Sequence, residues 1–225
     1  RLIHLSRIKV HGAESVAPFT ASSPLAPEGF YAESKAAAEI TLRHIEGLEF
    51  VIIRPPLVYG TGAKANMREL VRAAGLGIPF PAIRNNRRSV VGIDNLVSLI
   101  QAACEHDAAA GQSFLVSDGE DVSTAELIKR LSPRKPWLVP IPAFCMAAAR
   151  KITPTVFRKL AGTLQADIAG TRAVLGWVPM VTLADGLAKC AHMDHPIGTG
   201  PPDRPIRGLI EPSAPKPRRN SANLR

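Results

Sequence analysis

The stretch Glu49-Phe50-Val51-Ile52-Ile53-Arg54-Pro55-Pro56 decides the fold class of this chain. Four successive residues at its centre are apolar, with no polar residue alternating between them. Such a run is typical of a strand in the middle of a parallel sheet, where helices cover both faces of the strand. The two prolines end the strand, because proline has no N–H to donate to a neighbouring strand. We expect residues 57–62 to be a loop at the C-terminal end of this strand, where open α/β sheets bind ligands.

Strands and helices alternate on both sides of this stretch. Upstream, the pattern predicts a strand at residues 2–5 and a helix from Phe30 to about Ile45. Downstream, it predicts strands at 89–91, 113–116 and 136–142 and helices at 67–74, 95–104, 124–131, 167–175 and 183–191. We expect Asp94, Ser123 and Thr182 to cap three of these helices. The alternation predicts an α/β protein with a parallel sheet.

Composition limits the class of protein. The chain has 225 residues and is 46% hydrophobic, which suffices for one large domain or two small ones. No apolar run reaches the ~20 residues of a membrane helix, and no signal peptide is visible, so we expect no membrane partner. The cysteines, Cys104, Cys145 and Cys190, are far apart and predict buried thiols in a reducing, cytoplasmic setting. No Cys/His cluster suggests a metal site.

The net charge of +9 is unevenly distributed along the chain. Residues 196–225 contain six Lys/Arg and two Asp/Glu. Residues 1–195 contain 22 Lys/Arg and 17 Asp/Glu. The body is therefore only mildly basic, which argues against a nucleic-acid-binding domain. The segment 196–225 is rich in proline and lacks periodicity, so we expect a disordered tail. A basic tail could touch nucleic acid or acidic lipid, but a solvated end is the favoured interpretation.

A tyrosine and a lysine carry the candidate chemistry. The stretch Tyr31-Ala32-Glu33-Ser34-Lys35 places them four residues apart, on one face of the predicted helix. A fixed ammonium group favours the phenolate form of a nearby tyrosine, so the pair could act as a base toward a substrate hydroxyl. This spacing is common by chance and, taken alone, also fits an exposed tyrosine and a surface lysine.

The order of short motifs resembles a known family. From about Leu2 to Leu187 the chain contains, in order, LSRIKVHG, FYAESK, VIIRPPLVYGTGAKAN, NRRSVVGIDNL, FLVSDGEDVST and LGWVP. This order resembles the extended short-chain dehydrogenase/reductases and, more closely, the nucleotide-sugar epimerases and dehydratases of the UDP-glucose 4-epimerase type. The segments RPPLVYG and SDGEDVST look like a bacterial branch linked to surface polysaccharide assembly, which includes reductases of 4-keto UDP-sugars.

The resemblance implies roles for the residues that match. Tyr31 would be the catalytic acid/base, and Lys35 would hold the nicotinamide ribose and support Tyr31. The backbone around Pro55, Leu57 and Val58 would meet the nicotinamide ring. The implied cofactor is NAD, with NADP left open, and the reaction would be hydride transfer at C4 of a UDP-sugar.

The resemblance also implies where the substrate is held. Asn66 and Arg88 match positions that bind the nucleotide diphosphate, and a guanidinium fork suits phosphate oxygens. Without the family context, Arg88 reads equally well as a surface arginine. Trp177 is expected to pack in the core of the smaller substrate domain and not to contact the ligand. A homodimer through the Tyr31 helix is permitted by the small side chains at Ala36–Ala38.

The chain departs from the family pattern after its first strand. The family usually has two hydroxyl residues before IKVxG, the second of which helps to bind the reacting oxygen. Here Ser6 is retained as a catalytic candidate, but the second position is Arg7. Because neighbouring strand residues point to opposite faces, Ser6 cannot simply replace the missing hydroxyl. We expect Arg7 to crowd the substrate and to reduce or alter activity.

A second departure concerns the glycine-rich turn that binds the cofactor pyrophosphate. The sequence contains no GxxGxxG turn, and the family pattern places about a hundred residues before Leu2. The hypothesis is that the chain is a fragment: residues 1–62 would form the C-terminal part of a doubly wound Rossmann-like sheet. Residues 63–195 would form mainly a small α/β substrate domain, and residues 196–225 the tail.

Four functions were weighed from these residues. An NAD-dependent UDP-sugar epimerase/dehydratase leads, and a 4-keto-sugar reductase is its nearest rival. A non-catalytic relative that binds a nucleotide sugar or a protein is favoured by Arg7 and by the absent glycine turn, but the Tyr31/Lys35 pair opposes it. A nucleic-acid-binding module that uses the tail is the weakest of the four.

Overall fold

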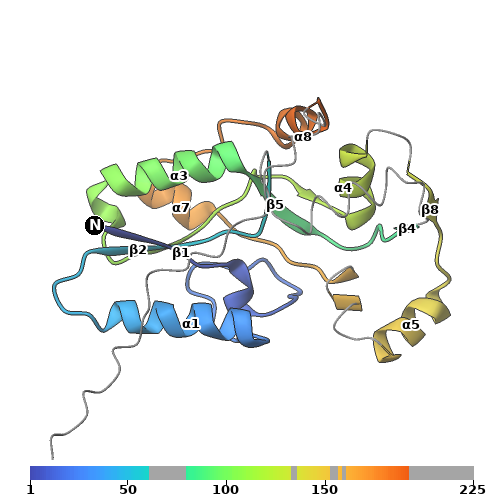
Figure 1. Cartoon of the computed structure of the whole chain (residues 1–225), viewed down its shortest axis with the longest axis horizontal. Coiled ribbons are helices and arrows are strands. Elements are labelled where there is room, and N and C mark those ends of the chain that lie inside the picture. The colour runs from blue at the N-terminus through green and yellow to red at the C-terminus, as the bar shows by residue number, and fades with distance from the viewer. Residues whose placement is uncertain (61–79, 133–135, 153–156, 159–160, 193–225) are drawn as a thin grey trace, which may run out of the picture. The chain divides into compact units, whose positions relative to one another are not determined.

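The computed structural model describes residues 1–60, 80–132, 136–152, 157–158 and 161–192 (Figure 1). The predicted helix at 67–74 and the predicted tail at 196–225 lie outside these ranges. All described residues belong to one unit, Arg1–Met193. The predicted division at residues 62 and 63 stays a prediction.

A parallel three-stranded sheet confirms the expected α/β class. Its strands are β1 (Leu2–Leu5), β2 (Phe50–Arg54) and β6 (Ser113–Leu115), in the order β1-β2-β6. Leu5 is paired with Ile53, and Ile53 with Phe114. Val51, Ile52 and Ile53 of the apolar run are fully buried, and Phe50 is half-buried. As predicted, β2 is the middle strand, because only a strand that is covered on both faces tolerates such a sequence.

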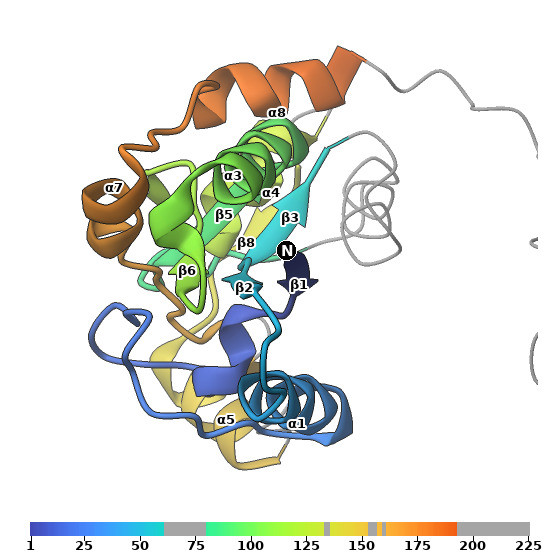
Figure 2. The ribbon, with the colours of Figure 1, turned by 90° about the vertical axis from the view of Figure 1, so that its left-hand side faces the viewer.

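Helices lie on both faces of this sheet (Figure 2). Helix α1 (Phe30–Arg43) lies on one face, and α3 (Ile93–Glu105) and α7 (Ala169–Leu175) lie on the other. The buried side chains of α1 are Ala32, Ala36 and Glu39, so small residues let this helix approach the sheet closely. The main core lies on the α3 side and includes Trp177. The expected core position of Trp177 is confirmed, and this core is the one that β2 and α3 share.

A second sheet begins immediately after the prolines and corrects one expectation. Residues 57–62 were expected to be a loop, but Leu57–Tyr59 form strand β3, which is parallel to β5 (Arg88–Gly92). β5 also pairs in antiparallel fashion with β7 (Asp121–Val122). The prolines therefore end β2 without ending the extended chain, since β3 finds its hydrogen-bond partner in a different sheet.

The remaining elements cover the second sheet and extend from it. Helices α4 (Thr124–Leu131) and α8 (Leu183–His192) share a core with β3 and β5. A two-stranded sheet pairs β4 (Phe80–Pro81) with β8 (Leu138–Val139), and α5 (Ala143–Ile152) follows β8 (Figure 1). Two 3-10 turns, at Ile8–His11 and Asp107–Ala109, complete the described elements. In this part of the chain, no helix is both long and apolar enough to cross a bilayer.

Helix capping was predicted correctly in two of three places. Ser123 Oγ accepts a hydrogen bond from the N–H of Glu126 at 3.1 Å, and Thr182 caps α8 in the same way at 3.2 Å. The expectation for Asp94 is wrong, because α3 begins at Ile93 with Gly92 as its N-cap. Asp94 instead accepts a hydrogen bond from Lys189 Nζ at 2.9 Å.

Two smaller expectations also need correction. Cys104 is exposed, so the prediction of buried thiols is wrong for this residue, whereas Cys145 and Cys190 are partly buried. The helix expected to open at Asp167 begins two residues later, at Ala169. Asp167 lies before the helix and accepts a hydrogen bond from the N–H of Ala169 at 2.8 Å.

Candidate functional site

The first two turns of α1 present Tyr31 and Lys35 beside the end of β1. The burial of Ala32 and Ala36 against the sheet leaves Tyr31 on the outer side of the helix, where it is 62% exposed. Lys35 reaches back to the sheet, and its Nζ donates a hydrogen bond to the carbonyl of Leu5 at 2.9 Å. The helix thus fixes the ammonium at the C-terminal end of a parallel strand, the edge at which α/β sheets bind ligands.

Arg7 joins this pair from the segment that follows β1. Its guanidinium carbon lies 4.8 Å from the centre of the Tyr31 ring, within the range of a cation–π contact. Burial lowers the pKa of Arg7, and the nearby phenol of Tyr31 opposes that shift. Ser6, its neighbour, is buried. Tyr31, Lys35 and Arg7 therefore form one group at the end of β1, which we call the α1 cation group.

The other predicted site residues lie on different elements. Pro55 is buried, and its carbonyl accepts a hydrogen bond from the N–H of Ile8 at 2.9 Å. Leu57 and Val58 are half-buried in β3. Arg88 lies at the start of β5 in the second sheet, and burial lowers the pKa of its guanidinium. Asn66 lies outside the described residues.

A buried ionic cluster under α1 was not predicted from the sequence. Arg54, at the end of β2, donates from Nη2 to Glu39 Oε2 at 2.6 Å and from Nε to Oε1 at 3.1 Å. Its Nη1 lies 3.0 Å from His11 Nε2 and donates to the carbonyl of Ala21 at 2.8 Å. His11 Nδ1 lies 3.1 Å from the carbonyl of Pro24. Since that carbonyl can only accept, Nδ1 carries the proton and Nε2 accepts from Arg54.

The electrostatics of this cluster follow from its burial. Glu39 is completely buried and Arg54 is 2% exposed. Burial raises the pKa of Glu39, but hydrogen bonds led by those from Arg54 outweigh it, so the pKa lies below its ordinary value. Burial also lowers the pKa of His11, in agreement with the neutral ring that the hydrogen bonds require. The cluster fastens α1 and the loop after His11 to β2.

Two features of the sequence could have revealed this cluster. Arg54 ends an otherwise apolar, buried strand, and a buried arginine requires a partner. Glu39 follows Lys35 by four residues and falls on the buried side of α1. The sequence does not show that these two charges face each other, because that depends on how α1 lies across the sheet.

A second unpredicted network surrounds the carboxylate of Asp118. Tyr59 donates its hydroxyl proton to Asp118 Oδ2 at 2.6 Å, and Asn95 Nδ2 donates to Oδ1 at 2.7 Å. The N–H of Gly92 donates to the same carboxylate at 3.0 Å. Burial and, next, the hydrogen bond to Asp118 raise the pKa of Tyr59 far above its ordinary value. Tyr59 therefore holds its proton and serves to join β3, β5 and the loop after β6.

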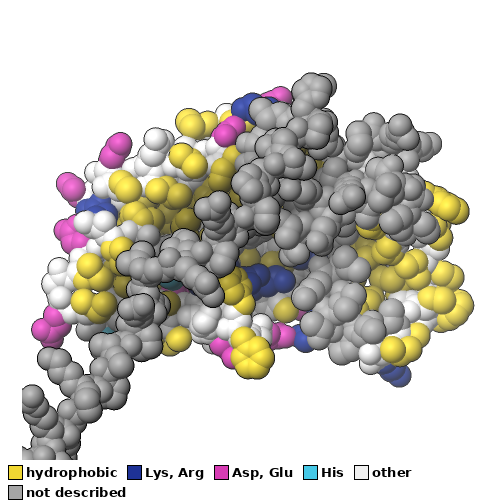
Figure 3. All heavy atoms as spheres, viewed as in Figure 1, with side chains coloured by type: hydrophobic (Ala, Val, Ile, Leu, Met, Phe, Trp, Pro, Cys, Tyr) yellow, Lys and Arg dark blue, Asp and Glu magenta, His cyan; other side chains and the backbone are white. Residues whose placement is uncertain are grey.

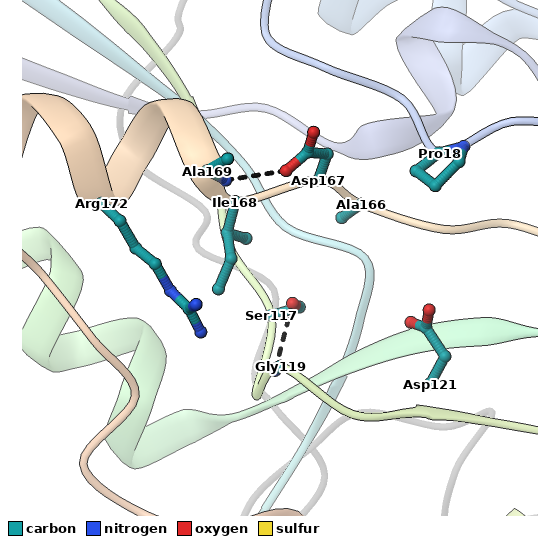
Figure 4. Close-up of a pocket in the computed structure, with 9 residues that line it drawn as sticks. All are labelled: Pro18, Ser117, Gly119, Asp121, Ala166, Asp167, Ile168, Ala169 and Arg172. Atoms are coloured by element: carbon teal, nitrogen blue, oxygen red, sulfur yellow. Dashed lines mark hydrogen bonds between the residues drawn. The ribbon is translucent and has the colours of Figure 1, made fainter.

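A shallow hollow of about 470 Å³ lies beside α7 (Figure 4). Arg172 points into it toward Ser117 and Gly119, whereas the carboxylate of Asp167 turns to the N–H of Ala169. Asp121, on the opposite wall, accepts hydrogen bonds from Ser89 and Gln165. The residues that line this hollow do not include those of the α1 cation group. Within the α1 cation group, Tyr31 is exposed, whereas Lys35 and Arg7 are half-buried.

Comparison with known proteins shows which family has these features. Residues 1–117 match the model of the NAD dependent epimerase/dehydratase family. The chain is 42% identical to a UDP-glucose 4-epimerase of Vibrio cholerae over an alignment of 203 residues. This alignment covers 85% of this chain and 62% of the epimerase. A UDP-glucose 4-epimerase of Mycolicibacterium smegmatis is 29% identical over 194 residues, and this alignment covers 80% of this chain and 57% of the epimerase. The chain thus spans about three fifths of the length of these relatives.

Solved structures share the fold. A dTDP-glucose 4,6-dehydratase from Bacillus anthracis in complex with NAD superposes with a TM-score of 0.64 at 18% identity, covering 85% of this chain and 60% of that one. A UDP-glucose 4-epimerase from Thermotoga maritima with UDP-glucose superposes with a TM-score of 0.62 at 19% identity. The superposition covers 84% of this chain and 62% of that one. These structures share the Rossmann-like arrangement of parallel strands and helices. Because residues 1–117, more than half of the 225 residues, match the family model, the chain belongs to the NAD dependent epimerase/dehydratase family.

Proposed function

We propose that this chain carries the catalytic tyrosine and lysine of an NAD-dependent epimerase/dehydratase that acts on a UDP-sugar by hydride transfer at C4. The observation that carries the proposal is the α1 cation group. Tyr31 is exposed, and Lys35, one turn away, is fixed to the carbonyl of Leu5. Because the chain spans about three fifths of its relatives, the proposal concerns the whole natural protein.

The donors at this edge fit the ribose of a dinucleotide. An ammonium group has three N–H donors, and in the described structure the carbonyl of Leu5 uses one of those on Lys35. Two remain for ribose hydroxyls, and the Tyr31 hydroxyl lies on the same helix face. The backbone of Pro55, Leu57 and Val58 would lie along the nicotinamide. When bound, NAD supplies the group that accepts and returns the hydride.

Tyr31 is the proposed acid/base. Its hydroxyl oxygen would take the proton from the C4 hydroxyl of the sugar and would return it when the hydroxyl forms again. Lys35, four residues along the helix, and the guanidinium of Arg7, 4.8 Å from the ring centre, are positive groups near this phenol. Lys35 is tied to Leu5, so its charge is held in place before substrate arrives.

The proposed substrate contacts lie further along the chain. Arg88 and Asn66 would bind the diphosphate, and the guanidinium fork of an arginine matches paired phosphate oxygens. The UDP-glucose 4-epimerase name of the relative that is 42% identical supports a uridine nucleotide. A homodimer through α1 stays a prediction: Ala36 is buried against the sheet and Ala37 is exposed, so the small residues do not form one free face.

Arg7 favours a second candidate function. Its guanidinium occupies the face of the Tyr31 ring, where the family pattern has a small hydroxyl residue. A cation there crowds a sugar that approaches the phenol. A non-catalytic relative that binds a nucleotide sugar is therefore the alternative to an enzyme. We expect Arg7→Ser to raise turnover in the natural protein, and unchanged turnover would count against crowding by Arg7.

The test uses the gene product as the source cell makes it, supplied with NAD and either UDP-glucose or UDP-galactose. Interconversion of the two sugars without net change in NADH absorbance supports an epimerase. In a second assay, supplied with NADH and a UDP-4-keto-sugar, consumption of one NADH for each sugar reduced identifies the reductase instead. Tyr31→Phe should lower turnover by about 10²- to 10⁴-fold. The control is Phe30→Leu, an adjacent exposed position outside the proposed roles.

Two outcomes would contradict the enzyme proposal. Binding of UDP without turnover, measured by calorimetry, would support the non-catalytic alternative. Turnover that survives Tyr31→Phe at the level of the Phe30→Leu control would remove Tyr31 from the mechanism.

A further inference from the structure

One segment accounts for the positive charge of the body of the chain. Residues 127–166 contain eight Lys/Arg and not one Asp or Glu. The rest of the first 195 residues holds 14 Lys/Arg and 17 Asp/Glu. The segment therefore stands as a basic stretch on an otherwise slightly acidic body. It includes the end of α4, β8 and α5.

Helix α5 turns an apolar stripe toward solvent. Phe144, Ala147, Ala148 and Ile152 lie on one helix face by their spacing, and all four are exposed. Phe144 is 75% exposed and Ile152 78%. In a globular protein, such a stripe normally faces the core. The unusual feature is thus an apolar helix face that the described residues leave uncovered.

The extended segment before α5 also exposes apolar side chains, here at every second residue. Trp137, Val139 and Ile141 alternate along the extended segment that contains β8, and all three are exposed. Trp137 is 63% exposed. Hydrophobic side chains gather over the end of the molecule that β8 and α5 occupy (Figure 3). We call these exposed residues of β8 and α5, together with Arg150 and Lys151, the β8–α5 face.

The cations of this face are available for binding. Arg130 and Arg158 form ion pairs with Glu120 and Glu28, respectively. Arg150 and Lys151 lie in the last turn of α5, are exposed, and have no ion pair among the described residues. Two adjacent cations thus border an exposed apolar stripe.

We propose that the β8–α5 face binds the surface of an anionic lipid bilayer. Short amphipathic segments with Trp, Phe and Ile beside Lys and Arg insert their apolar side chains at the headgroup boundary, while the cations attract anionic lipids. The hollow beside α7 is lined by other residues, and the β8–α5 face presents exposed, protruding side chains. A bilayer accepts protruding side chains without a complementary shape, which favours lipid over a protein partner.

This inference differs from the expectation that the chain has no membrane partner. That expectation came from the lack of an apolar run long enough to span a bilayer. Binding at the surface needs no spanning helix, and it requires only a short apolar stripe with neighbouring cations. The inference is also independent of the proposed catalysis, because Tyr31 and Lys35 lie on a different helix.

The test is co-sedimentation of the full chain with vesicles. One set contains phosphatidylglycerol mixed with phosphatidylcholine, and the other contains phosphatidylcholine alone. We expect binding to the anionic vesicles, little binding to the neutral ones, and weakening of the binding by salt. Arg150→Gln combined with Lys151→Gln should lower the partition coefficient roughly thirtyfold, from about 1 kcal/mol for each cation near the surface. Phe144→Ser combined with Ile152→Ser should also release the protein.

Matched controls separate this face from the basic tail. Arg218→Gln with Arg219→Gln removes the same charge from residues 196–225, and Val16→Ser with Met180→Ser removes two exposed apolar side chains elsewhere. Both controls should bind as the parent does, and circular dichroism should show that every variant is folded.

Several results would overturn the proposal. They are the absence of binding to anionic vesicles, equal binding to neutral vesicles, and loss of binding in the tail control. Binding to immobilised polyglutamate without binding to vesicles would instead identify an acidic protein surface as the partner.

Discussion

Tyr31 and Tyr59 are the two tyrosines of the chain, and the fold places them in opposite surroundings. Tyr31 is 62% exposed on the first turn of α1, with the Arg7 guanidinium over its ring. Tyr59 is 1% exposed and donates its proton to Asp118. Tyr31 thus lies beside a cation at the surface, whereas burial beside a carboxylate keeps the proton on Tyr59. The comparison teaches that the same phenol serves as candidate chemistry or as a structural donor according to its neighbours.

The largest expected effect on stability comes from the ionic cluster that supports the exposed tyrosine's helix. Glu39→Leu leaves Arg54 buried without its carboxylate partner and should lower the free energy of unfolding by about 3–5 kcal/mol. The double variant Glu39→Leu/Arg54→Met should recover much of this loss, because no unpaired charge remains. Denaturant unfolding measures both. A cost below about 1 kcal/mol for the single variant would show that the cluster is not needed to hold α1.

Tyr59→Phe comes next and tests the buried side of the comparison. It removes one hydrogen bond to a buried carboxylate and should cost about 1.5–3 kcal/mol. Chemical denaturation of the variant against the parent checks this value. If the loss were near zero, Asp118 would be adequately satisfied by Gly92 and Asn95, and the description of Tyr59 as a structural donor would need revision.

A smaller effect is confined to acid pH. The pKa of His11 is lowered in the fold, so the unfolded chain binds its proton first, and stability falls as the pH drops below the ordinary value of 6.5. The lowered pKa of Glu39 adds a further loss as the pH falls below the ordinary value of 4.5, because the unfolded chain again binds the proton before the folded protein does. His11→Gln should flatten the first part of this curve, measured as melting temperature against pH. An unchanged curve would mean that other groups control the acid transition.

Tyr31→Phe should have the smallest effect on stability. The substitution removes an exposed hydroxyl, so the free energy of unfolding should change by no more than about 0.5 kcal/mol. Tyr31→Phe and Tyr59→Phe both remove one phenol hydroxyl, the first at an exposed position and the second at a buried one. Equal losses from the two substitutions would break the comparison, whereas a stable but inactive Tyr31→Phe protein would sharpen it.

Local patterns predicted the fold class and most elements. The apolar run at residues 50–53 identified the central strand, and periodicity and capping placed α1, α4 and α8. Strand β3 was missed, because its partner β5 lies about thirty residues later and pairing across that distance leaves no local signal. The cap at Asp94 was wrong since Gly92, two residues earlier, already has the extended backbone of an N-cap.

The candidate site was only partly readable in the sequence. Tyr31 and Lys35 were found because helical spacing alone puts them on one face. Contacts between distant segments were not visible, among them the Arg7 guanidinium over Tyr31 and the pairing of Glu39 with Arg54. These depend on the angle and depth at which α1 lies on the sheet, which tertiary packing determines.

Asn95 has a consequence for how the molecule opens. Its side-chain oxygen accepts hydrogen bonds from the N–H groups of Met180 and Val181, both at 3.0 Å, and its nitrogen donates to Asp118 and to the carbonyl of Val181. All four hydrogen-bonding positions of the amide are thus used. Although Met180 and Val181 belong to no helix or strand, their amide protons should exchange with solvent as slowly as those of α3. We therefore predict that the segment before α8 and helix α3 open as one cooperative unit, which amide hydrogen exchange would measure.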